Sequence, residues 1–305
     1  MSNVLESGIQ KLVDEFQAIG KPCPSKSSIH ERRAGYLAST VLAGECHGAI
    51  EKHTDVANGI PITVYRPVHG ETLPIVIYFH GGCFISGGTE THEIQLRQIA
   101  TAANAIVVCI SYRLAPEFTY PAAHDDVFHA VQGIMQQGCI VGGDVANVVF
   151  AGDSAGGHLA LATALRLKRN NFALPRKLVL IYPMLDPFGR SESYRQYGDD
   201  FVITAQMLLS GFSLYAGNGA THKTLAELNL VEGMDYSGLP ATYIFTAEFD
   251  PLRDEGEALY RDLLTQGVDA YCERYLGVIH GFFQLSGISE TARRCIKNIA
   301  DIVVS

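Results

Sequence analysis

VVFAGDSAGGH, residues 148–158, is the stretch from which the rest of the chain can be placed. An apolar run rich in β-branched residues ends at Gly152, and a run of small residues typical of a helix begins at Ala155. Ser154 therefore lies at the corner of a predicted strand–turn–helix, where a G-x-S-x-G pattern lifts the serine hydroxyl clear of the sheet edge. Glycine at 152 and 156 fits so sharp a turn, because a side chain there would collide with neighbouring backbone. Alone, the pattern also fits an ordinary glycine-rich turn, so its meaning depends on partners elsewhere.

The composition is that of an ordinary folded protein. The chain has 305 residues, of which 47% are hydrophobic and 18% charged, enough for a large core in one domain. A formal net charge of -9 gives no basic surface for nucleic acid or an anionic membrane. The arginine pair at 32–33, like the basic pairs at 168–169 and 293–294, is typical of a solvated helix face. Seven cysteines, an odd number without metal-ligand spacing, and no visible signal peptide or membrane helix predict a reduced, cytoplasmic protein.

The order of predicted elements indicates the α/β class. Predicted helices and strands alternate along most of the chain, which predicts a parallel sheet covered by helices on both faces. Strands are expected at 49–56, 60–66, 73–79, 105–110, 148–152, 177–182, 241–247 and 270–276, and helices at 1–20, 28–42, 92–103, 122–137, 252–266 and 286–303. Residues 186–236 interrupt this rhythm with one clear helical run at 204–215, so this insertion is predicted to be a lid or small subdomain.

A nucleophilic serine needs a base within hydrogen-bond reach and a third group that orients the base. In hydrolases with this strand–turn–helix corner the partners follow in the order serine, acid, histidine, each after a later strand. The histidines after Ser154 are His158, His222 and His280. His280 comes directly after the last predicted strand, whereas His158 belongs to the helix after Ser154 and His222 to the insertion. An isolated loop histidine is more often structural, but the order of the chain favours His280 as base.

Asp250 is the preferred acid, in the segment AEFDPLRD (247–254) after the penultimate predicted strand. Asp followed by Pro251 also fits a helix N-cap with proline at the first helical position. Both roles can coexist, because a carboxylate has two oxygens and about four acceptor sites. Asp254 lies a turn further into the predicted helix, and strand alternation turns Glu248 away.

The segment HGGC, residues 80–83, follows a buried strand early in the sheet. Its glycines leave backbone N–H groups uncovered, and with the N–H of Ala155 they can form an oxyanion hole for a tetrahedral intermediate. Two glycines after a strand are, without such partners, more often just a turn.

Five segments together resemble the hormone-sensitive-lipase-like esterase family, and within it most closely the bacterial acetyl esterases. They are HGGCF at 80–84, YRLAPE at 112–117, GDSAGG at 152–157, AEFDPL at 247–252 and HGF at 280–282, spread over about residues 60–285. The resemblance implies one α/β-hydrolase domain over 1–305 with a mostly parallel sheet of about eight strands. It further implies a helical cap formed by 1–45 and 186–236, and hydrolysis of short-chain carboxylic esters without a cofactor or metal.

The same resemblance assigns roles to residues. Ser154 is the nucleophile, His280 the base and Asp250 its orienter. The backbone N–H groups of Gly82, Cys83 and Ala155 form the oxyanion hole, and Gly81 shapes the loop. Family members carry glycine where Cys83 stands, so its side chain is expected to restrict φ and to narrow the acyl pocket.

Two other functions stay open. An amide, formamide or acyl-peptide hydrolase would use the same triad. A non-catalytic receptor of the gibberellin-receptor type would share the fold, but such receptors lack the catalytic histidine. The presence of His280 in this chain therefore disfavours that function. The expected partner is a small-molecule ester, with no nucleic acid or membrane, and exposed apolar cap faces leave room for a homo-oligomer.

Overall fold

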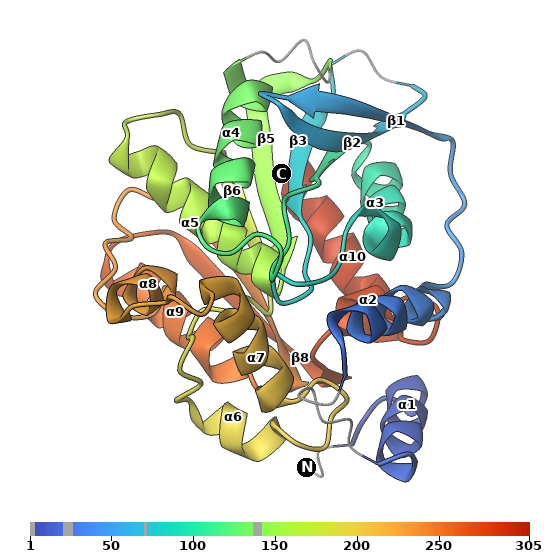
Figure 1. The fold of residues 1–305 in the computed structure, drawn as a ribbon. Coiled ribbons are helices and arrows are strands. Elements are labelled where there is room, and N and C mark those ends of the chain that lie inside the picture. Colours follow the sequence, from blue (N-terminus) through green and yellow to red (C-terminus); the bar gives the residue numbers. More distant parts are fainter. Residues whose placement is uncertain (1–3, 21–26, 70–71, 137–141) are drawn as a thin grey trace.

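The computed structural model describes residues 4–20, 27–69, 72–136 and 142–305. Within them, eight strands form one sheet in the order β1-β2-β4-β3-β5-β6-β7-β8 (Figure 1). β1 pairs antiparallel with β2 and β2 with β4, and every other pair is parallel. The strands are β1 (Ile50–Ala57), β2 (Ile60–Pro67), β3 (Pro74–Phe79), β4 (Ile106–Ile110), β5 (Asp144–Asp153), β6 (Lys177–Ile181), β7 (Ala241–Phe249) and β8 (Ala270–Ile279). The predicted mostly parallel α/β sheet is confirmed.

Helices cover both faces of the sheet, and the strand sequences explain why. Successive side chains of β3 point to opposite faces, so Ile75 and Ile77 join one buried cluster and Val76 and Tyr78 the other. The first cluster packs against α4 (Ala122–Gln136), α5 (Ala155–Arg169) and α9 (Arg253–Thr265). The second packs against α3 (Thr89–Ala103) and α10 (Glu290–Val304) (Figure 1).

The remaining helices come from the N-terminal segment and the insertion. The 186–236 segment carries α6 (Glu192–Tyr197), α7 (Ala205–Ala216) and α8 (His222–Leu228), of which the sequence pattern predicted only the middle one. With α1 (Ser7–Ala18) and α2 (Ile29–Ala38), these helices lie in the lower half of the molecule in Figure 1. Among the helices of the described residues, none combines the length and apolar content that a membrane crossing requires.

The two N-terminal helices make different contacts. Glu6, just before α1, donates its N–H to the carbonyl of Gly277 at 2.8 Å, and its carboxylate accepts the N–H of Glu290 at the start of α10 at 2.6 Å. α1 is thus tied to the β8 edge of the sheet. α2 instead lies against the loop that follows β3, through contacts described below.

Candidate active site

Ser154 occupies the turn between β5 and α5, as predicted. Its φ of 55° and ψ of -119° lie outside the favoured regions for a residue with a side chain. The turn leaves no room beside it, because a Cβ on Gly156 would overlap the carbonyl oxygen of Phe79. The Ser154 N–H donates to the carbonyl of Ile181 at 2.9 Å, which attaches the turn to the neighbouring strand. Such strain is maintained only where surrounding structure holds it.

The structure brings the three predicted triad residues into one hydrogen-bonded chain. His280 Nε2 lies 3.0 Å from Ser154 Oγ, and His280 Nδ1 lies 2.9 Å from Asp250 Oδ2. The side chains of Ser154, His280 and Asp250 are only 4%, 6% and 0% exposed. An ionised carboxylate only accepts, so Nδ1 carries the proton of a neutral imidazole and Nε2 is free to accept from the serine hydroxyl. The chain therefore has one direction, from hydroxyl to carboxylate.

The other oxygen of Asp250 has a separate partner. Oδ1 accepts the backbone N–H of Leu252 at 2.8 Å. The two uses of this carboxylate coexist, but the helix begins at Arg253 with Leu252 as its N-cap, so Asp250 closes a turn before the helix rather than capping it. The alternative acids are used elsewhere: Glu248 accepts the N–H of Gly277, and Asp254 that of Ser193.

His158 points away from Ser154 and belongs to another chain of hydrogen bonds. Its Nδ1 lies 2.9 Å from the carbonyl oxygen of Met184, and its Nε2 lies 3.2 Å from Nε2 of His124. His124 Nδ1 in turn lies 2.8 Å from the hydroxyl of Tyr215 on α7. His222 begins α8 in the insertion. His280 is thus the imidazole that the structure places against the serine.

The loop after β3 presents backbone N–H groups beside the turn of Ser154. Gly81 donates its N–H to Asp153 Oδ1 at 2.9 Å, so this group is already used. The N–H groups of Gly82, Cys83 and Ala155 have no acceptor among the described residues. Three free donors therefore remain, one directly after Ser154 and two on the loop after β3, and they are the three that the family resemblance implies.

The backbone conformation of Cys83 is unfavourable for a residue with a side chain. Its φ of 55° is in the left-handed region, which glycine adopts readily and which costs other residues about 1–2 kcal/mol of conformational energy. Its side chain lies against α7, because a Cβ on Gly211 would be 2.5 Å from the Cβ of Cys83. Burial raises the pKa of the Cys83 thiol to about 11. The thiol is therefore protonated at neutral pH and a poor nucleophile.

Sequence reasoning missed Asp153, although it lies inside the GDSAGG motif. This buried carboxylate accepts from Gly81 N–H, from the Tyr78 hydroxyl at 2.9 Å and from His92 Nε2 at 3.0 Å. Burial alone would raise its pKa, but His92 and the hydrogen bonds lower it below its usual range. Asp153 is thus an ionised anchor for the loop that carries Gly82 and Cys83. An acidic residue directly before the candidate nucleophile is the signal that could have identified it.

The prediction for the 32–33 arginine pair, a solvated helix face, is wrong for Arg33. Its guanidinium donates to the carbonyls of Ile85 at 2.8 Å and Ala115 at 3.0 Å, and pairs with both oxygens of Glu117. One side chain of α2 thereby joins the loop after β3 to the 112–117 segment. The sequence carried no local signal for this, because the partners lie 52–84 residues away.

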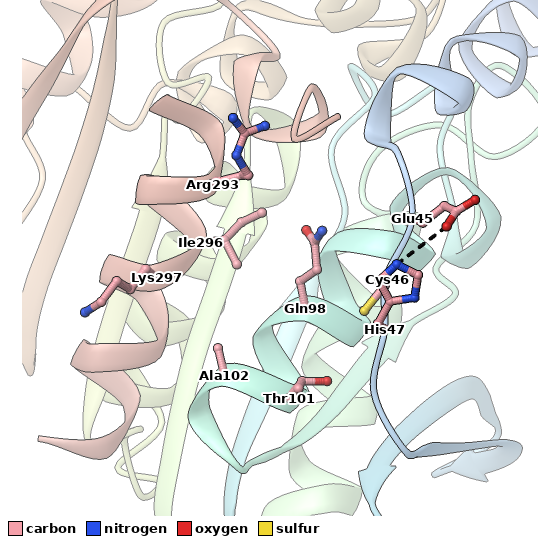
Figure 2. A pocket seen from close by; sticks show the side chains of 9 residues that line it. All are labelled: Glu45, Cys46, His47, Gln98, Thr101, Ala102, Arg293, Ile296 and Lys297. Atoms are coloured by element: carbon pink, nitrogen blue, oxygen red, sulfur yellow. Dashed lines mark ion pairs between the residues drawn. The ribbon is translucent and has the colours of Figure 1, made fainter. Parts of the chain in front are cut away.

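A pocket of about 350 Å³ lies elsewhere, between α3, α10 and residues 45–47 (Figure 2). No residue of the triad or of the 80–84 loop lines it. Its one ion pair, Glu45 with His47 at 3.5 Å, joins two side chains that are each more than 80% exposed. This pocket is a surface feature without a buried reactive group, so we place the candidate site at Ser154.

The comparisons with known proteins show the family to which the chain belongs. A family model described as alpha/beta hydrolase fold matches residues 76–284. The chain belongs to this family of α/β hydrolases, in its hormone-sensitive-lipase-like branch, and is a carboxylic ester hydrolase.

Individual relatives cover most of the chain. It is 36% identical over 241 residues to carboxylesterase NlhH of Mycobacterium tuberculosis, which covers 76% of this chain and 75% of the relative. It is 30% identical over 293 residues to ethyl acetate hydrolase of Pseudomonas putida, which covers 92% of each. The structure is similar to that of the hyperthermophilic esterase of the archaeon Pyrobaculum calidifontis, with a TM-score of 0.90, 34% identity, and coverage of 99% of this chain and 98% of the other.

Proposed function

We propose that this chain hydrolyses short-chain acyl esters through a Ser154–His280–Asp250 triad and an acyl-enzyme. Ser154 Oγ attacks the ester carbonyl while His280 Nε2 takes the hydroxyl proton. The bond between the acyl carbon and the ester oxygen then breaks, and His280 gives the proton to the leaving alcohol oxygen. Water, deprotonated by His280, attacks the acyl-enzyme and releases the acid and free Ser154. Asp250 holds the imidazole in the tautomer that accepts at Nε2 and stabilises the imidazolium.

The proposed oxyanion hole is the set of N–H groups of Gly82, Cys83 and Ala155. Each such donor contributes about 3–4 kcal/mol to transition-state stabilisation in comparable enzymes. Gly81 shapes the loop in this proposal, and the bond from its N–H to Asp153 supports that role. Ala155 is the first residue of α5, so its N–H also has the partial positive charge of a helix N-terminus behind it.

The observation that carries the proposal is the continuous contact of hydroxyl, imidazole and carboxylate, at 3.0 and 2.9 Å, from three loops far apart in sequence. We infer a preference for short acyl groups from the side chain that Cys83 places against Gly211 of α7, next to its own proposed donor N–H. The name of one relative, ethyl acetate hydrolase, points in the same direction. We further propose that α2 and the 186–236 helices act as a cap over this site.

The alternative function, hydrolysis of an amide, uses the same residues. Measuring kcat/KM for matched ester and amide substrates would distinguish it from ester hydrolysis. The receptor alternative is disfavoured, because His280 is present and in contact with both partners.

Replacing the nucleophile tests the proposal directly. We expect Ser154→Ala to lower kcat/KM for p-nitrophenyl acetate and butyrate by about 10⁴-fold or more, because no other group can form the acyl-enzyme. A serine-directed fluorophosphonate should label the wild type and the surface control Ser237→Ala, but not Ser154→Ala. For the wild type, kcat/KM should fall at least tenfold from butyrate to octanoate.

Two results would contradict the proposal. Turnover retained by a folded Ser154→Ala protein, judged by an unchanged melting temperature, would exclude this nucleophile. Activity that rises toward octanoate would exclude the short-chain preference while leaving the triad intact.

A further inference from the structure

Two neighbouring arginines on α2 differ sharply in their contacts. Arg33 donates to both carboxylate oxygens of Glu117 and to two carbonyls. Arg32 is half-buried, yet within the described part of the chain it has one acceptor, the carbonyl of Met207 at 3.4 Å, and no carboxylate. Burial lowers the pKa of Arg32, as expected for a cation without a counter-charge. The other group that affects it is the Cys83 thiol, which is neutral at pH 7.

The position of Arg32 is defined by the same two elements that border the candidate site. Its one bond goes to Met207 on α7, one turn before Gly211. Gly211 in turn packs on Cys83, a predicted oxyanion donor. Arg32, α7 and the Cys83 loop therefore meet at one place, next to the N–H groups of the proposed oxyanion hole.

A half-buried cation without a counter-charge is costly, and among the described residues Arg32 has only the carbonyl of Met207 as a partner. A guanidinium has five N–H donors in a planar fork, and at most one of those of Arg32 is used. Such a fork matches a carboxylate, with which it forms two parallel, charge-assisted hydrogen bonds. The chain as a whole carries a net charge of -9 and repels anions, so any attraction for one here must come from a local group.

We propose that Arg32 is a specificity-determining residue that binds an ionised carboxylate carried by the ester substrate. The preferred substrates are then short-chain esters with a second, anionic carboxylate, on either the acyl or the alcohol side. This inference rests on the proposed function, since it names a substrate class for the Ser154 site. Arg32 makes no contact in the triad, and its role is to hold the substrate rather than to take part in bond making.

The test compares matched pairs of esters that differ in one charge. On the acyl side the pair is monoethyl succinate and ethyl butyrate, followed by pH-stat titration. On the alcohol side it is 4-acetoxybenzoate and its methyl ester. In Arg32→Gln we expect kcat/KM for the anionic member of at least one pair to fall about 10–100-fold, mainly through KM, and for both neutral esters to change less than twofold. Arg32→Lys should recover part of the loss.

Arg195→Gln is the matched control, because Arg195 lies on α6, is largely exposed, and its replacement changes the net charge by the same amount. It should leave the anionic-to-neutral ratio of both pairs unchanged. If Arg32→Gln lowers kcat/KM equally for anionic and neutral esters, Arg32 has a structural role and the inference is overturned. If kcat/KM changes for neither pair of esters, the inference is overturned as well. Neither result affects the triad, which fails only if Ser154→Ala keeps its activity on the neutral esters.

Discussion

Two chains of hydrogen bonds run through imidazoles in this protein, one buried and one partly buried, and they differ in the group that accepts the last hydrogen bond. One joins the Ser154 hydroxyl to His280 and to the carboxylate of Asp250. The other joins the Tyr215 hydroxyl to His124, His158 and the backbone carbonyl of Met184. They lie next to each other, since the N–H of Met184 donates to the carbonyl of Ser154 at 3.1 Å.

The direction of each chain follows from its terminal acceptor. A carbonyl only accepts, so His158 must carry its proton on Nδ1, which leaves Nε2 to accept from His124. His124 then has a bare Nδ1, which accepts the hydroxyl proton of Tyr215. The same reasoning led from Asp250 through His280 to the hydroxyl of Ser154. Both chains are therefore complete when their imidazoles are neutral.

The difference appears when a proton is added. A proton taken from Ser154 makes His280 an imidazolium beside a full negative charge. The second chain offers only the partial charge of a carbonyl, and a protonated His158 would oppose the Nε2–H of His124. Burial lowers the pKa of His158 to about 4, and burial, His158 and Arg166 lower that of His124 well below its usual range. A carboxylate at the end, rather than an imidazole in the middle, is what suits a chain to proton transfer.

Asp250→Asn tests this conclusion and should have the largest effect. The Leu252 N–H binds Oδ1, so an asparagine would keep its carbonyl oxygen there and turn its NH₂ toward His280 Nδ1. The imidazole would then carry its proton on Nε2 and could no longer accept from Ser154. We expect kcat/KM for p-nitrophenyl butyrate to fall about 10⁴-fold, as for the corresponding change in other triads.

Asp254→Asn is the control for this variant, since it removes a carboxylate four residues away that contacts Ser193 instead of His280. Its kcat/KM should stay within about threefold of the wild type. Activity of folded Asp250→Asn at a tenth or more of the wild-type value would show that a charged terminus is not required.

The second chain predicts a loss of stability in acid. The folded-state pKa values of His124 and His158 lie below the unfolded value of about 6.5, so the unfolded chain binds more protons once the pH falls below 6.5. The contribution of these two neutral histidines to the free energy of unfolding is fully present above pH 6.5. It is lost as the pH falls toward 4, at up to about 1.4 kcal/mol per pH unit for each histidine. Arg166 adds to the effect on His124, while its ion pair with Asp125 at 2.6 Å offsets part of that charge.

Urea unfolding at pH 7.5, 6.0 and 5.0 measures this loss. The free energy of unfolding of a His124→Gln/His158→Asn double variant should decline less with falling pH than that of the wild type. A single His158→Asn variant should lie between them. Parallel curves for all three proteins would mean that these imidazoles do not resist protonation.

The comparison also shows what could be predicted from the sequence. Ser154, Asp250 and His280 each follow a strand within a recognisable segment, so the order of local patterns was enough to bring them together. His158 was correctly assigned to its helix, but its partner His124 lies 34 residues earlier, and no spacing rule connects the two. The short helices α6 and α8 escaped prediction because six or seven residues show too little periodicity, and their positions depend on packing. Arg33 was misassigned because its hydrogen-bond partners lie on distant elements.

The smallest effect is expected from removing the hydroxyl that begins the second chain. Tyr215→Phe keeps the ring, which stacks on Phe84 with centroids 4.6 Å apart, but leaves His124 Nδ1 and the His124 N–H without this partner. An unsatisfied buried group costs about 1–3 kcal/mol, and these two groups are only partly buried, so the free energy of unfolding in urea should fall by about 1 kcal/mol at pH 7.5. Because Tyr215 lies on α7 and His124 on α4, the loss should be much smaller in a protein that already carries His124→Gln. If the two changes are instead additive, the hydroxyl does not act through His124, and the direction derived for this chain is wrong.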